Sequence, residues 1–138
     1  MSIIQTTTTS FKQEVLLGVH NLEVDTLKIA LYTANADLNE GTTVYGTTAE
    51  VVGTGYTAGG IVLTGVTVLA SGTTAYVNFN NAVWNPASFT ARCALIYNAS
   101  KGNKSIAVLD FGADKSSSTV FTVQMPANTA STALIRFM

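Results

Sequence analysis

The sequence predicts an all-β protein, an antiparallel β-sandwich of jelly-roll-like form with one short helix near its N-terminus. Two observations carry this prediction. Beyond residue 24 the apolar residues recur with a period of two, which is the pattern of strands, and the apolar runs are short and separated by turn residues. No helical pattern of crossover length lies between these runs, so antiparallel pairing is expected.

The predicted helix spans residues 11–18. Ser10 is placed to cap it, and Gln13 stands three residues further on, at the capping-box position. An apolar stripe follows at a spacing of four, formed by Phe11, Val15 and Val19. Gly18 indicates where the helix ends. The stripe is expected to pack on a sheet or on a neighbouring subunit.

Residues 1–9 precede this helix and contain four consecutive threonines at positions 6–9. Such a tract predicts either a disordered tail or an extended arm that pairs with the sheet edge of a neighbouring chain. No linker or low-complexity segment divides the rest of the chain. Residues 10–138 are therefore expected to form a single β-sandwich domain.

The first strand of the domain is expected to be half-buried. Leu27, Ile29 and Leu31 point to one face, and the residues between them point to the other. A glycine-rich connection at residues 51–60 then leads into an apolar run at residues 61–69. The turn Ser71-Gly72 joins that run to residues 75–79, which predicts a hairpin.

Residues 89–97 predict the longest strand. Its alternate residues are expected to share one face, and these are Phe89, Ala91, Cys93, Leu95 and Tyr97. Polar turns are expected at residues 98–103 and 112–118. The remaining strands are expected at residues 105–111, 120–125 and 132–137.

The composition favours a protein that associates with other proteins. The 138 residues are 47% hydrophobic and 11% charged, where an average soluble protein has about 25% charged residues. A neutral polar surface offers little charge repulsion between copies, so we expect a homodimer or homotrimer. The net charge of −1 and the scattered lysines and arginines argue against nucleic acid as a partner.

Neither a signal peptide nor an apolar run of membrane-spanning length is apparent, so no membrane partner is expected and the chain is expected to remain in a cytosol.

The few residues that could perform chemistry are better explained structurally. His20, Glu23 and Asp25 lie close together in sequence, but at the end of the predicted helix, where the helix dipole alone favours a histidine. Residues 53–58 fit a dinucleotide-binding fingerprint, yet no helix follows to hold a pyrophosphate. Cys93 lies on an apolar strand face and is expected to be an inert buried thiol. We therefore predict no enzyme activity, no catalytic residue, no cofactor and no metal.

Three aromatic residues are the candidates for contact with a partner. Tyr45, Tyr56 and Trp84 lie in or beside predicted loops, outside the regularly alternating strands. Tyrosine and tryptophan are typical anchors of protein interfaces. The alternative interpretation is that the three rings pack at the edge of the core.

Five segments, spread along most of the chain, together resemble small virion-associated proteins of tailed bacteriophages. They are residues 11–20, 27–33, 50–60, 89–98 and 107–112.

This resemblance implies a jelly-roll-like capsid decoration (cement) protein on the outside of the shell. Such a protein would clamp adjacent major capsid protein subunits and would be made in the host bacterial cytoplasm. The alternatives are a tail or head-fibre structural or receptor-binding module, or a soluble ligand-binding or enzymatic domain.

Overall fold

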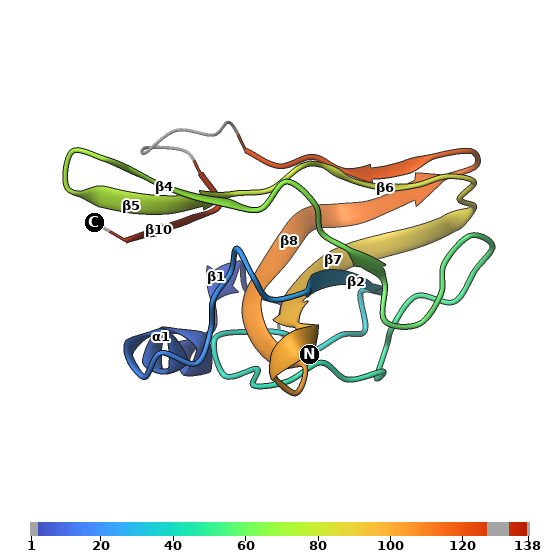
Figure 1. Cartoon of the computed structure of the whole chain (residues 1–138). Coiled ribbons are helices and arrows are strands. Elements are labelled where there is room, and N and C mark those ends of the chain that lie inside the picture. Colours follow the sequence, from blue (N-terminus) through green and yellow to red (C-terminus); the bar gives the residue numbers. More distant parts are fainter. Residues whose placement is uncertain (1–2, 127–132, 138) are drawn as a thin grey trace.

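The computed structural model describes residues 3–126 and 133–137. They form mostly β structure in antiparallel sheets, with one short N-terminal helix, which confirms the predicted β-rich, antiparallel character and the helix (Figure 1). In chain order the elements are β1 (Thr6–Thr7), α1 (Thr9–Leu16), β2 (Leu27–Tyr32), β3 (Ile61–Val62), β4 (Thr67–Ser71), β5 (Thr74–Asn78), β6 (Ala82–Trp84), β7 (Phe89–Asn98), the 3-10 turn η1 (Ala99–Lys101), β8 (Lys104–Ser117), β9 (Phe121–Val123) and β10 (Ile135–Phe137).

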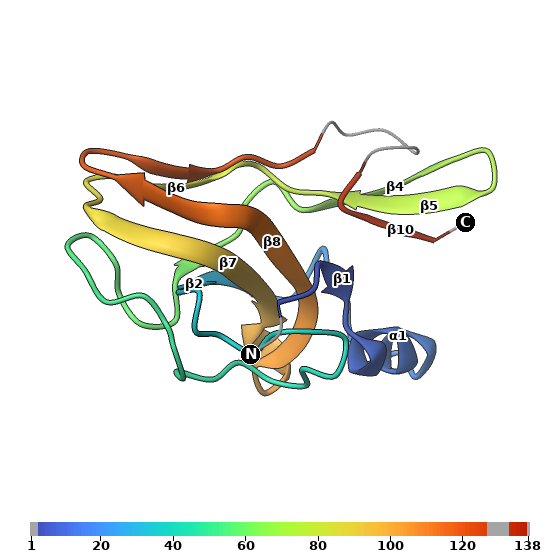
Figure 2. The same cartoon turned by 180° about the vertical axis from the view of Figure 1, so that it is seen from behind.

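The strands of the described residues form three sheets. The largest has the order β1-β8-β7-β2-β3, the second has the order β10-β5-β4, and β6 pairs with β9. Figures 1 and 2 show the two smaller sheets in one layer over the large sheet, with α1 below the three-stranded sheet at one end. A main core fills the space between the layers, with contributions from Ile29, Val77, Trp84 and Ile96, and Phe11 anchors the helix to it.

The large sheet is covered on its second face as well. There a smaller second core contains Ala30, Tyr32 and Leu95 from the sheet, together with Leu38 from the long connection after β2. The expectation of a half-buried first strand is therefore wrong. Both faces of β2 are buried because residues 33–50 fold back across the sheet.

An irregularity in the pairing of β7 with β8 corrects the predicted strand face. Ala91 lies opposite Lys115, whereas Cys93 lies opposite Asp110, so the register shifts between the two β7 residues. A register shift of this kind moves the following side chains to the other face. Phe89 and Ala91 accordingly face the main core, while Cys93, Leu95 and Tyr97 face the second core.

The polar segment at residues 112–118 was expected to be a turn, and this expectation is also wrong. Strand β8 continues to Ser117, which lies opposite Phe89. The turn-forming residues lie at an irregular point within the strand, where Gly112 has a φ of 81°. The long β7 supplies a pairing partner on both sides of that irregularity.

Part of the N-terminal segment pairs within the chain's own large sheet. Thr6 and Thr7 form β1 and pair with Val108 and Ala107 of β8. Thr8, rather than Ser10, caps the helix, since its side chain accepts a hydrogen bond from the Phe11 N–H. Residues 1 and 2 lie outside the described residues.

The predicted hairpin forms between β4 and β5, but the apolar run before it is divided. Residues 61 and 62 pair with β2 in the large sheet, and Gly65, with a φ of 65°, separates them from β4. The strands expected at 120–125 and 132–137 are the shorter β9 and β10; residue 132 lies outside the described part. Strand β6 was not predicted.

Candidate interaction surface

Tyr45 and Tyr56 converge on Glu50, a buried carboxylate in the connection between β2 and β3. The Tyr45 hydroxyl donates to Oε1 at 2.7 Å, the Tyr56 hydroxyl donates to Oε2, and the Gly59 N–H donates to Oε2 at 2.8 Å. Tyr56 also accepts from the Leu31 N–H at 3.0 Å. These contacts pin the connection to the large sheet, so both hydroxyls are engaged within the chain.

The tyrosines around Glu50 are held in their neutral form. Burial, followed by the negative charge of Glu50, raises the pKa of Tyr97 to about 12. Burial and the hydrogen bond to Glu50 raise the pKa values of Tyr45 and Tyr56 well above the usual range. Tyr97 also donates to the Gly59 carbonyl at 2.6 Å, which ties β7 to the same connection.

Trp84 lies in a strand, not in a loop, and is only 3% exposed. Its ring makes edge contacts with Phe89 and Phe121, with centroid separations of 6.5 and 6.1 Å. The Tyr56 ring joins this cluster at 5.8 Å from Phe89. Trp84 therefore stabilises the main core and presents almost no surface to a partner.

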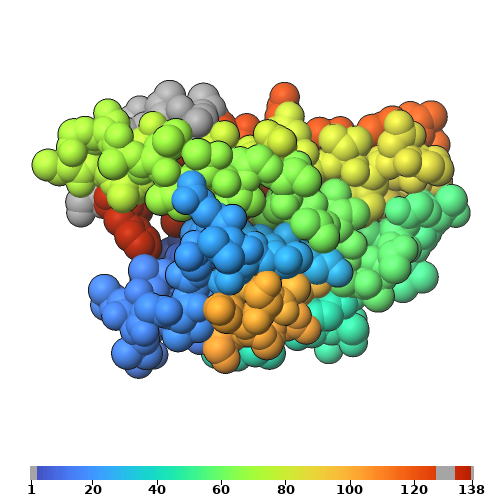
Figure 3. Space-filling model, viewed as in Figure 1, coloured from blue at the N-terminus to red at the C-terminus, as the bar shows by residue number. Residues whose placement is uncertain are grey.

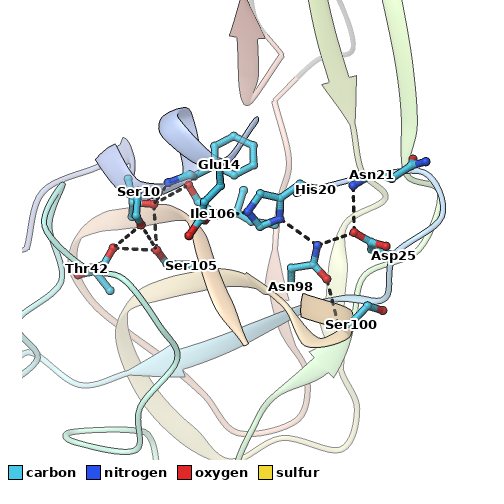
Figure 4. A network of polar contacts seen from close by, with 12 residues as sticks. Ser10, Glu14, His20, Asn21, Asp25, Thr42, Asn98, Ser100, Ser105 and Ile106 are labelled. Carbon is cyan, nitrogen blue, oxygen red and sulfur yellow. Dashed lines mark hydrogen bonds and ion pairs between the residues drawn. The ribbon is translucent and has the colours of Figure 1, made fainter. Parts of the chain in front are cut away.

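His20 lies in a polar network that joins the end of α1 to the end of β7 (Figure 4). Its Nε2 is 2.9 Å from Glu14 Oε1, and its Nδ1 is 3.0 Å from the Asn98 side-chain amide. That amide also donates to Asp25 Oδ2 at 2.8 Å. The contacts are satisfied when Nε2 carries the proton and Nδ1 accepts. Glu23, which the sequence places near His20, points elsewhere and accepts from the Val68 N–H.

The charge of Asp25 is stabilised by this network. Burial raises the pKa of Asp25, but hydrogen bonds from Asn21 and Asn98 and the charge of Lys101 outweigh it, so the pKa is lowered. The Lys101 Nζ lies 3.6 Å from Asp25 Oδ1. The His20 side chain is 0% exposed, so the network holds the segment after α1 in place and does not present the imidazole to solvent.

Large apolar side chains are exposed at the end of the molecule where α1 approaches the three-stranded sheet. Leu16, Leu17 and Val24 are 88%, 71% and 76% exposed. Val68 and Leu69 of β4 and Phe137 of β10 are also exposed. We call these six residues the apolar end. A groove of about 460 Å³ joins its two sides, with Val15 and Leu22 on one side and Val68 and Phe137 on the other.

The apolar end is not among the predicted contact residues, although the sequence contains a pattern that indicates it. Leu16 and Leu17 fall outside the helical stripe that contains Phe11 and Val15, and the helix buries that stripe. Apolar residues off the buried stripe of a helix must face solvent or a partner. Exposed apolar patches of this kind are typical of interaction sites.

Comparisons with family models, with curated proteins and with solved structures found no match. Within the described residues, no group of three His, Cys, Asp or Glu side chains is arranged to hold a metal ion. Among the same residues, no helix is long and apolar enough to cross a membrane.

Proposed function

We propose that this chain is a structural protein of a tailed-bacteriophage virion, and specifically a capsid decoration (cement) protein. It binds the outside of the shell and clamps adjacent major capsid protein subunits. The observation that carries the proposal is the apolar end. Three large apolar side chains there, those of Leu16, Leu17 and Val24, are largely exposed and belong to neither of the two cores.

The fold suits this role. Two layers packed about a main core are compatible with a jelly-roll-like sandwich, the finer architecture that we propose for it. The Glu50 and His20 networks hold the long connections against the sheets. A clamp on a shell needs such a pre-organised surface, because ordering flexible loops on binding would cost affinity.

The contact with the shell should depend little on salt. The chain is 11% charged, and the apolar end is made of uncharged residues. Screening acts mainly on exposed charges, so attachment through apolar area should persist at high ionic strength. Binding to assembled but not to dissociated subunits then stabilises the shell by mass action.

The test is co-sedimentation of the purified chain with shells that lack it, at about 0.05 and about 0.5 M salt. The variant carries Leu16→Ser, Leu17→Ser and Val24→Ser together. Because each large side chain contributes about 1.5 kcal/mol or more when buried, we expect binding to weaken at least about a hundredfold.

The matched control is Val52→Ser. Val52 is 95% exposed, but it lies in the connection between β2 and β3, near β7, away from α1. The control should bind like the wild type at both salt concentrations. Shells that bind neither protein would overturn the cement proposal and favour a tail or head-fibre role.

A further inference from the structure

Within the described residues, strand β4 is an edge strand with no strand paired on its outer side. It occupies the outer position in the order β10-β5-β4, and all five of its residues, Thr67–Ser71, are exposed. Figure 3 shows the hairpin of β4 and β5, in green, extending along the upper edge beyond the rest of the chain. Native edge strands are usually protected by lysine, proline or a bulge. The sequence of β4 contains neither residue, and its pairing with β5 is regular.

A carboxylate stands where a neighbouring strand would place a carbonyl. Glu23 Oε2 accepts from the Val68 N–H at 3.0 Å, so that N–H points away from β5. Main-chain groups alternate in direction along a strand, and the outward groups of β4 therefore belong to Val68 and Ala70. The side chain of Glu23 thus accepts a hydrogen bond from an outward N–H of β4, as a carbonyl of an added strand would.

We propose that β4 is a strand-addition edge for a second copy of this chain, and that Glu23 is the group that leaves when the copy binds. The two β4 strands pair antiparallel about a two-fold axis at Leu69. Val68 of each copy then lies opposite Ala70 of the other, and the two residues exchange both main-chain hydrogen bonds. Four hydrogen bonds form, and a continuous six-stranded sheet results.

The edge fits its own copy for two reasons. Its outward groups lie one residue to either side of Leu69, so a two-fold axis at that residue brings each donor opposite an acceptor. The strand is uncharged, so identical strands bring no like charges into opposition. The exposed Leu69 side chains meet across the axis and add apolar contact. Glu23 opposes pairing, because it occupies the Val68 N–H and would bring two carboxylates to one interface.

A cysteine crosslink tests the register. In a non-hydrogen-bonded antiparallel pair the Cα atoms are about 4.5 Å apart, which is within the range that a disulfide spans. Leu69→Cys should therefore crosslink to its copy under mild oxidation, as seen on a non-reducing gel. Ser71→Cys is the control, since residue 71 lies opposite residue 67 of the second copy. The native Cys93 is buried and does not compete. Equal crosslinking of both variants, or none, would overturn the register.

Sedimentation equilibrium measures dimerisation, and it tests the roles of the β4 edge and of Glu23. Ala70→Pro removes an outward N–H that makes no bond to β5, a place where strands tolerate proline, and should weaken dimerisation at least about tenfold. Glu23→Ala removes the competing acceptor and should strengthen it by about tenfold. Glu40→Ala, at an exposed carboxylate in the segment 33–50, should change nothing.

Melting curves will show that each variant is folded. A folded Ala70→Pro protein that dimerises like the wild type would overturn the proposal, as would an unchanged Glu23→Ala protein. These measurements use the chain alone. A failure here leaves shell binding standing, and a failure to bind shells leaves the β4 pairing standing.

Discussion

Replacing Glu50 with alanine should destabilise the fold more than any change to an exposed carboxylate. Three donors converge on Glu50, and they come from Tyr45, Tyr56 and the Gly59 N–H. A buried N–H left without an acceptor costs about 1–3 kcal/mol, whereas the two hydroxyls can turn toward water and lose less. We therefore expect Glu50→Ala to lower the free energy of unfolding by about 3 kcal/mol.

For a domain of this length a loss of that size lowers the melting temperature by about 10 °C. Thermal unfolding followed by circular dichroism measures it, with Glu40→Ala as the control at an exposed site. Glu50→Gln keeps one acceptor oxygen and nearly the same volume, so its loss should be about half as large. Melting of the Glu50→Ala protein within about 2 °C of the wild type would refute the assigned role of the carboxylate.

Three further predictions concern pH and the helix cap. Tyr45, Tyr56 and Tyr97 have raised pKa values in the folded chain, so their contribution is complete below the unfolded value of about 10 and is lost as pH rises toward the folded values. Melting temperature should fall steeply above about pH 10, and a flat profile would contradict this. Asp25 has a lowered pKa, so its contribution is complete above about pH 4 and is lost as pH falls further; Asp25→Asn should flatten that acid limb. Thr8→Ala removes the cap of α1 and should cost about 1–2 kcal/mol in urea unfolding, whereas a neutral effect would show that the cap is dispensable.

The period-two pattern was sufficient to predict the strands but not their surroundings. Leu27, Ile29 and Leu31 were correctly placed on one face, because alternation is a property of the extended chain itself. Burial of the other face, with Ala30 and Tyr32, depends on where residues 33–50 fold. A connection without apolar periodicity gives no local signal of the surface that it will cover.

The irregular pairing of β7 with β8 could not be predicted for a similar reason. The run from Phe89 to Tyr97 alternates without interruption in sequence, yet Arg92 has no Cα partner in the register with β8, and the faces change there. Which strand receives an extra residue is decided by the pairing partner, here β8 with its irregularity near Gly112. Pairing between distant segments cannot be derived from either segment alone.

Some residues of the candidate surface can be identified from the local sequence, and others depend on contacts between distant segments. Tyr45 and Tyr56 could be identified as loop aromatics, but Glu50, which directs their hydroxyls inward, is an ordinary acidic residue in sequence. Leu16 and Leu17 could have been identified, because their place off the helical stripe is local information. That the helix lies across a groove from β4 and β10 could be seen only in the structure.

The most direct test of the proposed function is the thermal disassembly of shells that lack this protein, followed with and without the purified chain. We predict that the chain raises the disassembly temperature, at low and at high salt, and that the Leu16→Ser, Leu17→Ser, Val24→Ser protein does not. Shells that disassemble at the same temperature with and without the wild-type chain would contradict the cement function.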